Sequence, residues 1–193
     1  MRSLGYFAGW LAAVLWAAPA GAQDERPEEP APSSFEVRLR GGLGGYTGSY
    51  APLTSVGPAW GLSIGFKTAS WAGLELAYEG SQNNLQGRGG ALVRNGGFLL
   101  GRVFCDRGEL FPYLAAGVGV TYVDPTQGAG ASAIGDTVIE VPFALGLDWR
   151  RGVLSVGVRA AFNLLLGERF LQPLSPDGEA GFASGSLLLG LGF

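Results

Sequence analysis

The last thirteen residues, from Gly181 to Phe193, constrain the fold of this chain most strongly. They read GFASGSLLLGLGF, and an apolar row runs through Leu187, Leu189 and Leu191 to the final phenylalanine. Side chains two residues apart lie on the same face of a strand, so the segment predicts a strand with one apolar face. An apolar strand at the end of an exported chain is expected to close a barrel in a membrane.

The opposite terminus predicts export. A positive start at Arg2 is followed by an apolar stretch from Leu4 to Ala18 and by the small residues Ala20-Gly21-Ala22. This three-part pattern is typical of a secretory signal peptide, with cleavage expected between Ala22 and Gln23. Fifteen apolar residues before such a site are too short for a retained membrane anchor. We therefore expect residues 1–22 to be a signal peptide.

Composition limits the remaining 171 residues (193 minus 22) to one domain. Their mild acidity argues against a nucleic-acid partner, and the single cysteine, Cys105, cannot form an internal disulfide. No apolar run after the leader reaches eighteen residues, which excludes a helical membrane span. Residues 23–34, QDERPEEPAPSS, are acidic and proline-rich and predict a flexible lead-in.

From Phe35 onward the chain divides into segments of alternating polarity, each near the 9–11 residues of a membrane strand. Eight strands are predicted, at Phe35–Tyr46, Ala59–Thr68, Ala72–Gly80, Leu92–Cys105, Pro112–Val123, Thr137–Trp149, Val153–Leu165 and Gly181–Phe193.

Two of these segments depart from clean alternation. In the fourth, Arg94 and Arg102 share a face with Phe98, and we expect the arginine face to point inward unless a bulge at Gly96-Gly97 resets the alternation. In the sixth, Pro142 lacks a donor for the ladder, so a bulge or weak pairing is expected there.

Long and short connections alternate along the chain. The long ones are 47–58, 81–91, 124–136 and 167–180, and the short ones lie around 69–71, 106–111 and 150–152. This layout, with an even number of strands, is that of an outer-membrane barrel with short periplasmic turns. Both ends of the barrel domain, 35–193, are then periplasmic.

Aromatic residues decide which face is outward. They fall near both ends of the strands, as two belts flanking an aliphatic band, which is expected of a surface that faces lipid. The alternative is a secreted soluble ligand-binding barrel, in which the same residues would form an inner core. The predicted girdle residues are Trp60, Trp71, Tyr78, Tyr113, Tyr122, Trp149 and Phe193.

The polar faces then fill the interior. Eight strands leave room for side chains rather than for an open pore, and charges removed from water must pair. We therefore expect an ion-paired plug, with a narrow channel for small solutes as the alternative. The predicted network comprises Glu36, Arg38, Arg40, Lys67, Glu75, Glu79, Arg102, Glu140, Asp148 and Arg159, together with Arg94.

The chain resembles the small outer-membrane barrels of the OmpA and OmpX type, often grouped as porin-family proteins. The stretch Pro112-Tyr113-Leu114-Ala115-Ala116-Gly117-Val118-Gly119 and the terminal Phe193 carry the resemblance, which covers residues 35–193. It implies a monomer in the outer membrane of a Gram-negative cell, with membrane lipid as its surroundings and Phe193 as a signal to the barrel-assembly machinery. The chain ends with the barrel, so the peptidoglycan-binding domain of the OmpA family is not implied.

The search for chemistry predicts no catalytic, cofactor or metal site. The sequence has no histidine, which removes Ser-His-Asp triads and histidine metal sites. Some small outer-membrane barrels are lipid A acyltransferases or deacylases, but that resemblance relies on a histidine. Gly61-Leu62-Ser63-Ile64-Gly65 matches a nucleophile-elbow pattern, yet it lies within an alternating strand rather than at a strand-to-helix turn. Glu75 and Glu79 are about 13 Å apart along a strand, too far to act jointly.

We therefore expect a protein that is not an enzyme. Its role would be structural or one of surface interaction, carried by the four long loops with an unidentified extracellular partner. Cys105 is expected to be incidental.

Overall fold

The computed structural model describes residues 35–87, 89–105, 108–126, 134–167, 170–171 and 180–193. The predicted signal peptide, residues 1–22, and the lead-in, residues 23–34, lie outside this part of the chain.

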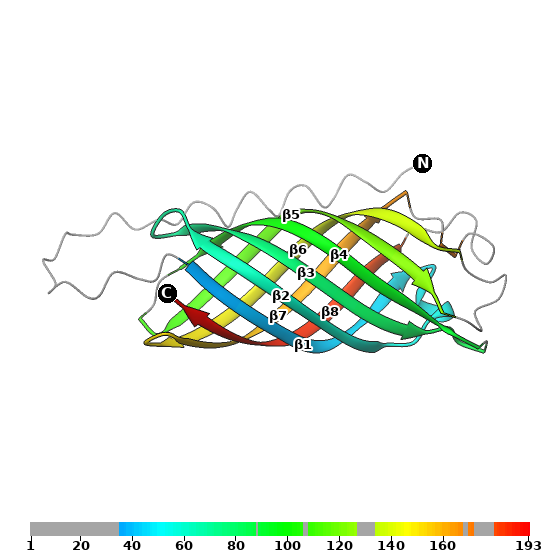
Figure 1. The fold of residues 1–193 in the computed structure, drawn as a ribbon, viewed down its shortest axis with the longest axis horizontal. Coiled ribbons are helices and arrows are strands. Elements are labelled where there is room, and N and C mark those ends of the chain that lie inside the picture. Colours follow the sequence, from blue (N-terminus) through cyan, green and yellow to red (C-terminus); the bar gives the residue numbers. More distant parts are fainter. Residues whose placement is uncertain (1–34, 88, 106–107, 127–133, 168–169, 172–179) are drawn as a thin grey trace, which may run out of the picture. The chain divides into compact units, whose positions relative to one another are not determined.

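In the described ranges, eight strands and one short 3-10 helix form the fold (Figure 1). Their bounds are β1 Phe35–Gly48, η1 Ala51–Leu53, β2 Gly57–Lys67, β3 Ala72–Asn84, β4 Ala91–Phe104, β5 Leu110–Pro125, β6 Asp136–Arg151, β7 Leu154–Leu166 and β8 Ala180–Gly192. Among the described residues, no helix is long and apolar enough to cross a membrane.

The strands form a closed barrel in chain order, and each one pairs antiparallel with its neighbours. The barrel closes where β1, blue in Figure 1, lies beside β8, red, with Val37 opposite Leu191. The Phe193 N–H donates to the Phe35 carbonyl oxygen at 2.8 Å. The predicted eight-stranded antiparallel barrel is confirmed. We call the end of the barrel that holds Phe35, Phe193 and the short turns the turn end. The opposite end, which holds the long connections, is the loop end.

Alternation along each strand gives the wall an apolar outside and a polar inside. Leu39 is 58% exposed on the outer face, while its neighbours Arg38 and Arg40 are 2% and 9% exposed inside the barrel. This is the reverse of the polarity expected of a soluble ligand-binding barrel, where apolar side chains would fill the interior. An apolar outer band is what a barrel wall presents to lipid.

The strand pairing shows whether the two segments that depart from clean alternation contain a bulge. Across Gly96-Gly97 the pairing of β4 with β3 and β5 is continuous, so β4 has no bulge there. Beside Pro142 the β5–β6 pairing is interrupted between Ala116↔Phe143 and Gly119↔Glu140, which agrees with the weak pairing expected at that proline. The register is the same on both sides of the gap, because the paired residue numbers keep the same sum.

Candidate functional site

Charged side chains from six strands meet inside the barrel, and we call them the interior network. At its centre, Glu75 of β3 accepts a hydrogen bond from Arg159 Nη1 of β7 at 2.9 Å. Four residues further along β3, Glu79 accepts a hydrogen bond from Arg40 Nη1 of β1 at 2.8 Å. Arg102 of β4 lies 3.5 Å from Glu75 through Nε. These groups are nearly all buried, so each charge depends on the others for compensation.

A second group of ion pairs lies nearer the turn end. Asp148 of β6 is 2.9 Å from Arg38 Nη2 and accepts a hydrogen bond from Arg102 Nη2 at 3.2 Å. Glu36 contacts Arg38 and accepts from Arg150 Nη2 at 3.2 Å. The Arg102 guanidinium also lies 4.0 Å from the centroid of the Tyr113 ring, a cation–π distance.

The loop end of the lumen is filled by apolar side chains, which we call the apolar plug. Its buried members are Tyr46, Tyr50, Leu85, Leu92, Val123, Val138, Leu165, Phe170, Leu171 and Phe182. The Tyr46 ring lies 5.4 Å from Phe170 and 5.3 Å from Phe182 between centroids. The side chains of the plug and of the interior network together fill the lumen, as expected of a narrow eight-stranded barrel.

The structure places the predicted network residues as follows. The inward residues Arg38, Arg40, Glu75, Arg94, Arg102, Glu140, Asp148 and Arg159 are buried. Glu36, Lys67 and Glu79 face inward and are partly exposed. The expected pairing of Glu75 and Glu79 with arginines across the interior is present.

One predicted girdle residue is wrong. Tyr113 is 4% exposed and lies inside the barrel. Its position on β5 has the same parity as the inward Ala115, and it pairs with Gly146 of β6, whose missing side chain leaves room for the ring. The other predicted girdle residues are exposed. Trp60 and Tyr122 lie toward the loop end, Trp71, Trp149 and Phe193 lie toward the turn end, and Tyr78 lies at the middle of β3.

Three polar residues that contact the charged groups were not in the predicted network. Arg150 has the parity of Asp148, two residues before it, which is the signal that places it inward. Asn163 Nδ2 donates to Glu140 at 2.7 Å, and Ser155 Oγ donates to Glu36 at 2.7 Å. Both belong to the polar face of β7, but a hydroxyl or amide on a strand gives no sequence signal for a particular partner.

The outer wall carries a groove of about 670 Å³ across β6, β7, β8 and β1. Small outward residues at Gly41, Ala160 and Gly185 form its floor, and Leu43 and Leu187 are among its sides. The register explains this arrangement, because Gly185 lies opposite Leu43 of β1 on one side and Ala160 of β7 on the other. A Cβ atom built on Gly41 or Gly185 meets nothing within 4 Å.

The motif residues carry no site of their own. Ser63, the centre of the Gly61–Gly65 pattern, is 1% exposed within β2 rather than at a strand-to-helix turn. Cys105 is an exposed free cysteine. In the part of the chain that the structure describes, no group of three His, Cys, Asp or Glu residues could hold a metal ion.

Solved structures share this architecture. Neisserial surface protein A, from Neisseria, matches with a TM-score of 0.66 and 14% identity over 85% of this chain and 100% of that one. The N-terminal barrel of OprF from Pseudomonas aeruginosa gives 0.56 and 16%, over 84% and 99%. Ail, the attachment invasion locus protein of Yersinia pestis, gives 0.52 and 9%, also over 84% and 99%. The fold is therefore that of the small eight-stranded outer-membrane barrels.

A comparison with family models assigns the chain to one family. A family model described as lipid A 3-O-deacylase (PagL) matches residues 54–161, which is more than half of the 193-residue chain. The chain belongs to the lipid A 3-O-deacylase (PagL) family. A comparison with curated proteins finds no match. The expectation that the protein is not an enzyme is contradicted by this family, whose description is that of a deacylase, and an enzyme is plausible.

Proposed function

We propose that this protein acts on lipid A-type lipids from the outside of a sealed barrel and takes one of their acyl chains into the groove across β6, β7, β8 and β1. The groove is the observation that carries the proposal, since the family description names a lipid with ester-linked acyl chains as the substrate.

Because side chains fill the lumen, we infer that a lipid binds on the outer wall of the barrel. The interior network and the apolar plug leave no room for a lipid inside the barrel, and the outer surface already faces hydrocarbon. A membrane lipid reaches the groove by diffusing along the bilayer. A narrow channel is not favoured by a lumen filled in this way, nor by membership of a deacylase family.

The groove suits a hydrocarbon chain in both shape and chemistry. Its outward lining comes from glycine backbone and from alanine, valine and leucine side chains, which offer no hydrogen bond that a headgroup needs. The lining also includes two polar residues, Arg159 and Ser186, which alternate with the outward ones along β7 and β8. Its volume of about 670 Å³ lies within the range of roughly 300–1,000 Å³ typical of small-ligand sites. Without a Cβ at Gly41 and Gly185, a chain can lie directly against the strand backbone.

The proposal places the protein in the outer membrane of a Gram-negative cell, the membrane in which lipid A-type lipids occur. The signal-peptide pattern of residues 1–22, with cleavage after Ala22, supports export to that membrane. The turn end is then periplasmic, and the loop end faces the outside of the cell.

Native mass spectrometry of the full-length mature protein in detergent tests the lipid site. Gly185→Leu fills the groove without meeting its own chain, because the glycine is exposed and a Cβ there has no neighbour within 4 Å. We expect this variant to retain lipid A roughly tenfold less well, because the leucine side chain fills the groove and removes the close packing of an acyl chain against the strand backbone.

Gly97→Leu is the matched control. Gly97 is also an exposed outward glycine with no neighbour within 4 Å of a built Cβ, but it lies on β4, away from the groove. Equal loss of lipid in both variants, or in neither, contradicts the proposed site.

Cleavage is measured separately, by mass spectrometry of lipid A from cells that express the protein. The loss of one acyl chain in wild type, and less loss with Gly185→Leu, identifies hydrolysis of the chain held in the groove. Because the sequence has no histidine, the base for such a reaction would come from another residue type. Unmodified lipid A in cells, with groove-dependent binding in detergent, limits the function to lipid binding.

A further inference from the structure

An amide side chain lies on the outer, lipid-facing wall of the barrel. Asn95 of β4 has the parity of the outward residues Leu99 and Val103, and it is partly exposed. Hydrocarbon offers no hydrogen-bond partner, so an amide in such a wall is costly unless its donors and acceptor are satisfied. What satisfies Asn95 therefore indicates what this part of the wall binds.

The acceptor of the amide is satisfied by a neighbouring strand. The Tyr78 hydroxyl of β3 donates to Asn95 Oδ1 at 2.5 Å. Tyr78 lies opposite Gly97, which is two residues from Asn95 toward the turn end. Because the nitrogen and the oxygen of an amide project on different sides of its carbon, Nδ2 is directed away from Tyr78. The hydrogen bond therefore fixes the direction in which Asn95 donates.

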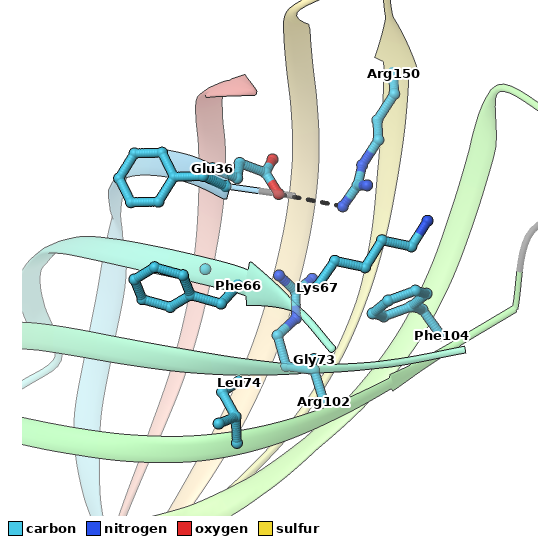
Figure 2. A pocket seen from close by; sticks show the side chains of 10 residues that line it. Glu36, Phe66, Lys67, Gly73, Leu74, Arg102, Phe104 and Arg150 are labelled. Atoms are coloured by element: carbon cyan, nitrogen blue, oxygen red, sulfur yellow. Dashed lines mark hydrogen bonds and ion pairs between the residues drawn. The ribbon is translucent and has the colours of Figure 1, made fainter. Parts of the chain in front are cut away.

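The donor of the amide has no partner within the described residues. Nδ2 carries two hydrogens, and the Tyr78 contact uses only the oxygen of the group. By contrast, charged groups in the lumen face one another, as Figure 2 shows for Arg150 and Glu36, whose Nη2 and Oε2 atoms lie 3.2 Å apart. An acceptor for Asn95 has to come from outside the protein.

Two exposed aromatic side chains flank the amide. Asn95 lies opposite Gly80 of β3 on one side and Tyr122 of β5 on the other. A Cβ built on Gly80 would overlap the Trp60 indole near Nε1, so the indole of β2 lies across this glycine toward Asn95. We call Trp60, Tyr78, Asn95 and Tyr122 the amide patch. It combines hydrogen-bond donors with apolar ring faces on the outside of the barrel.

A carboxylate lies on the loop-end side of the amide patch. Asp124 of β5 is exposed two residues beyond Tyr122, and it has no ion-pair partner among the described residues. Among the described outward side chains of β3, β4 and β5, it is the only charged one. A cationic group is therefore favoured there, and a purely anionic headgroup is disfavoured.

We propose that the amide patch binds one diacyl phospholipid with a zwitterionic headgroup that carries an ammonium group. An acyl-ester carbonyl oxygen accepts from Asn95 Nδ2, the ammonium group faces Asp124, and the chains lie on the apolar wall toward the turn end. The order of these groups in the lipid matches the order of their partners along the strands. Two residues of a strand span about 7 Å, which leaves room for the phosphate between ester and ammonium.

The amide patch is separate from the groove across β6, β7, β8 and β1. It uses hydrogen-bond donors on β2, β3, β4 and β5, whereas the outward lining of the groove is apolar. The phospholipid site therefore does not depend on the function proposed for the groove.

Native mass spectrometry of the full-length mature protein in dodecyl maltoside tests the ester contact. The protein is offered equal amounts of phosphatidylethanolamine with ester-linked chains and with ether-linked chains of the same length. The ether lipid lacks the carbonyl and keeps the headgroup. We expect wild type to retain the ester lipid roughly fivefold better, which corresponds to one hydrogen bond. Asn95→Leu should retain the two lipids equally.

Two variants control for a structural effect. Asn84→Leu makes the same change at an exposed outward amide where β3 ends, and it should keep the ester preference. Tyr78→Phe removes the hydrogen bond that directs the amide, so its ester preference should fall between those of wild type and Asn95→Leu. A variant that only folds less well loses both lipids alike, which leaves the ratio unchanged.

The headgroup is tested with ester lipids alone. We expect wild type to retain phosphatidylethanolamine roughly threefold better than phosphatidylglycerol, which has no ammonium group. Asp124→Asn should lose most of this headgroup preference and keep the preference for ester over ether. An unchanged headgroup preference in Asp124→Asn would overturn the zwitterionic assignment.

Three results would overturn the site itself. The first is an ester-to-ether ratio near one in wild type, and the second is an equal ratio in wild type and Asn95→Leu. The third is a loss of ester preference in Gly185→Leu, which would place the lipid in the groove. We expect Gly185→Leu to keep the preference, because the groove lies on the other wall.

Discussion

Arg94 and Glu140 form a two-point contact at the boundary between the interior network and the apolar plug. Arg94 Nε donates to Glu140 Oε1 at 2.9 Å, and Nη2 contacts the second carboxylate oxygen. The same guanidinium lies 4.7 Å from the ring centroid of Phe182, a member of the plug. One arginine therefore joins the charged and the apolar parts of the lumen.

Glu140→Ala is expected to lower the free energy of unfolding by about 3–5 kcal/mol, because it leaves Arg94 buried without its carboxylate. Urea unfolding of the protein in lipid vesicles measures the change. Asp124→Asn, at an exposed carboxylate on β5, is the control and should change stability by less than about 0.5 kcal/mol. The double variant Arg94→Met with Glu140→Leu removes both charges and should be nearly as stable as wild type. A loss equal to the sum of the losses of the single variants Arg94→Met and Glu140→Leu would contradict a specific pair.

Gly146→Ala is expected to destabilise the barrel by about 1–3 kcal/mol, because the new Cβ would lie within the Tyr113 ring. Adding Tyr113→Ala should remove most of this penalty, which a double-mutant cycle of unfolding free energies measures. Gly97→Ala, at a glycine with open space above it, is the control. Additive effects of the Gly146 and Tyr113 changes would mean that the ring does not occupy this space.

Deletion of Phe193 is expected to reduce the amount of folded protein in the outer membrane. Phe193 N–H donates to the Phe35 carbonyl oxygen where β8 meets β1, and its side chain is 67% exposed at the turn end. Membrane fractionation with heat-modifiable gel mobility gives the folded amount, and Phe193→Tyr, which keeps an aromatic terminus, should assemble normally. Wild-type levels of the deletion variant would show that assembly does not require this residue.

Pure protein in a planar bilayer is expected to give no steady single-channel openings. The lumen is filled by the apolar plug at the loop end and by the interior network below it, and the transfer of an ion through a packed apolar region is costly. Steady openings from wild-type protein would contradict a sealed interior. A preparation of a known open porin in the same bilayer shows that insertion can be detected.

The fold could be predicted because strand alternation depends on every second residue. The parity of Arg38 and Arg40 against Leu39 is enough to place the polar face inside once the outer face is assigned to lipid. Tyr113 was misplaced because its position near a strand end outweighed its parity, although the neighbouring Ala115 faces inward as well. The predicted third strand was too short. It was expected to end at Gly80, but β3 continues to Asn84, and Asn83 is buried within it.

The candidate sites were harder to predict than the fold. The apolar plug uses Leu92, Val123 and Leu165, which occupy inward positions where the alternation rule expects polar side chains. The groove depends on Gly41, Ala160 and Gly185 meeting across three strands, and this requires the register between strands far apart in sequence. A single sequence gives each strand's faces but not its shift against a neighbour.

The pairing of β1 with β8 has a consequence for biogenesis. Because β1 and β8 are the first and last strands along the chain, the hydrogen-bonding groups along the free edge of β1 have no native partner until β8 is in place. A partly delivered chain has two open edges and cannot shield its backbone from hydrocarbon. Closure of this barrel therefore needs every strand from β1 to β8, and no smaller set of strands can complete it.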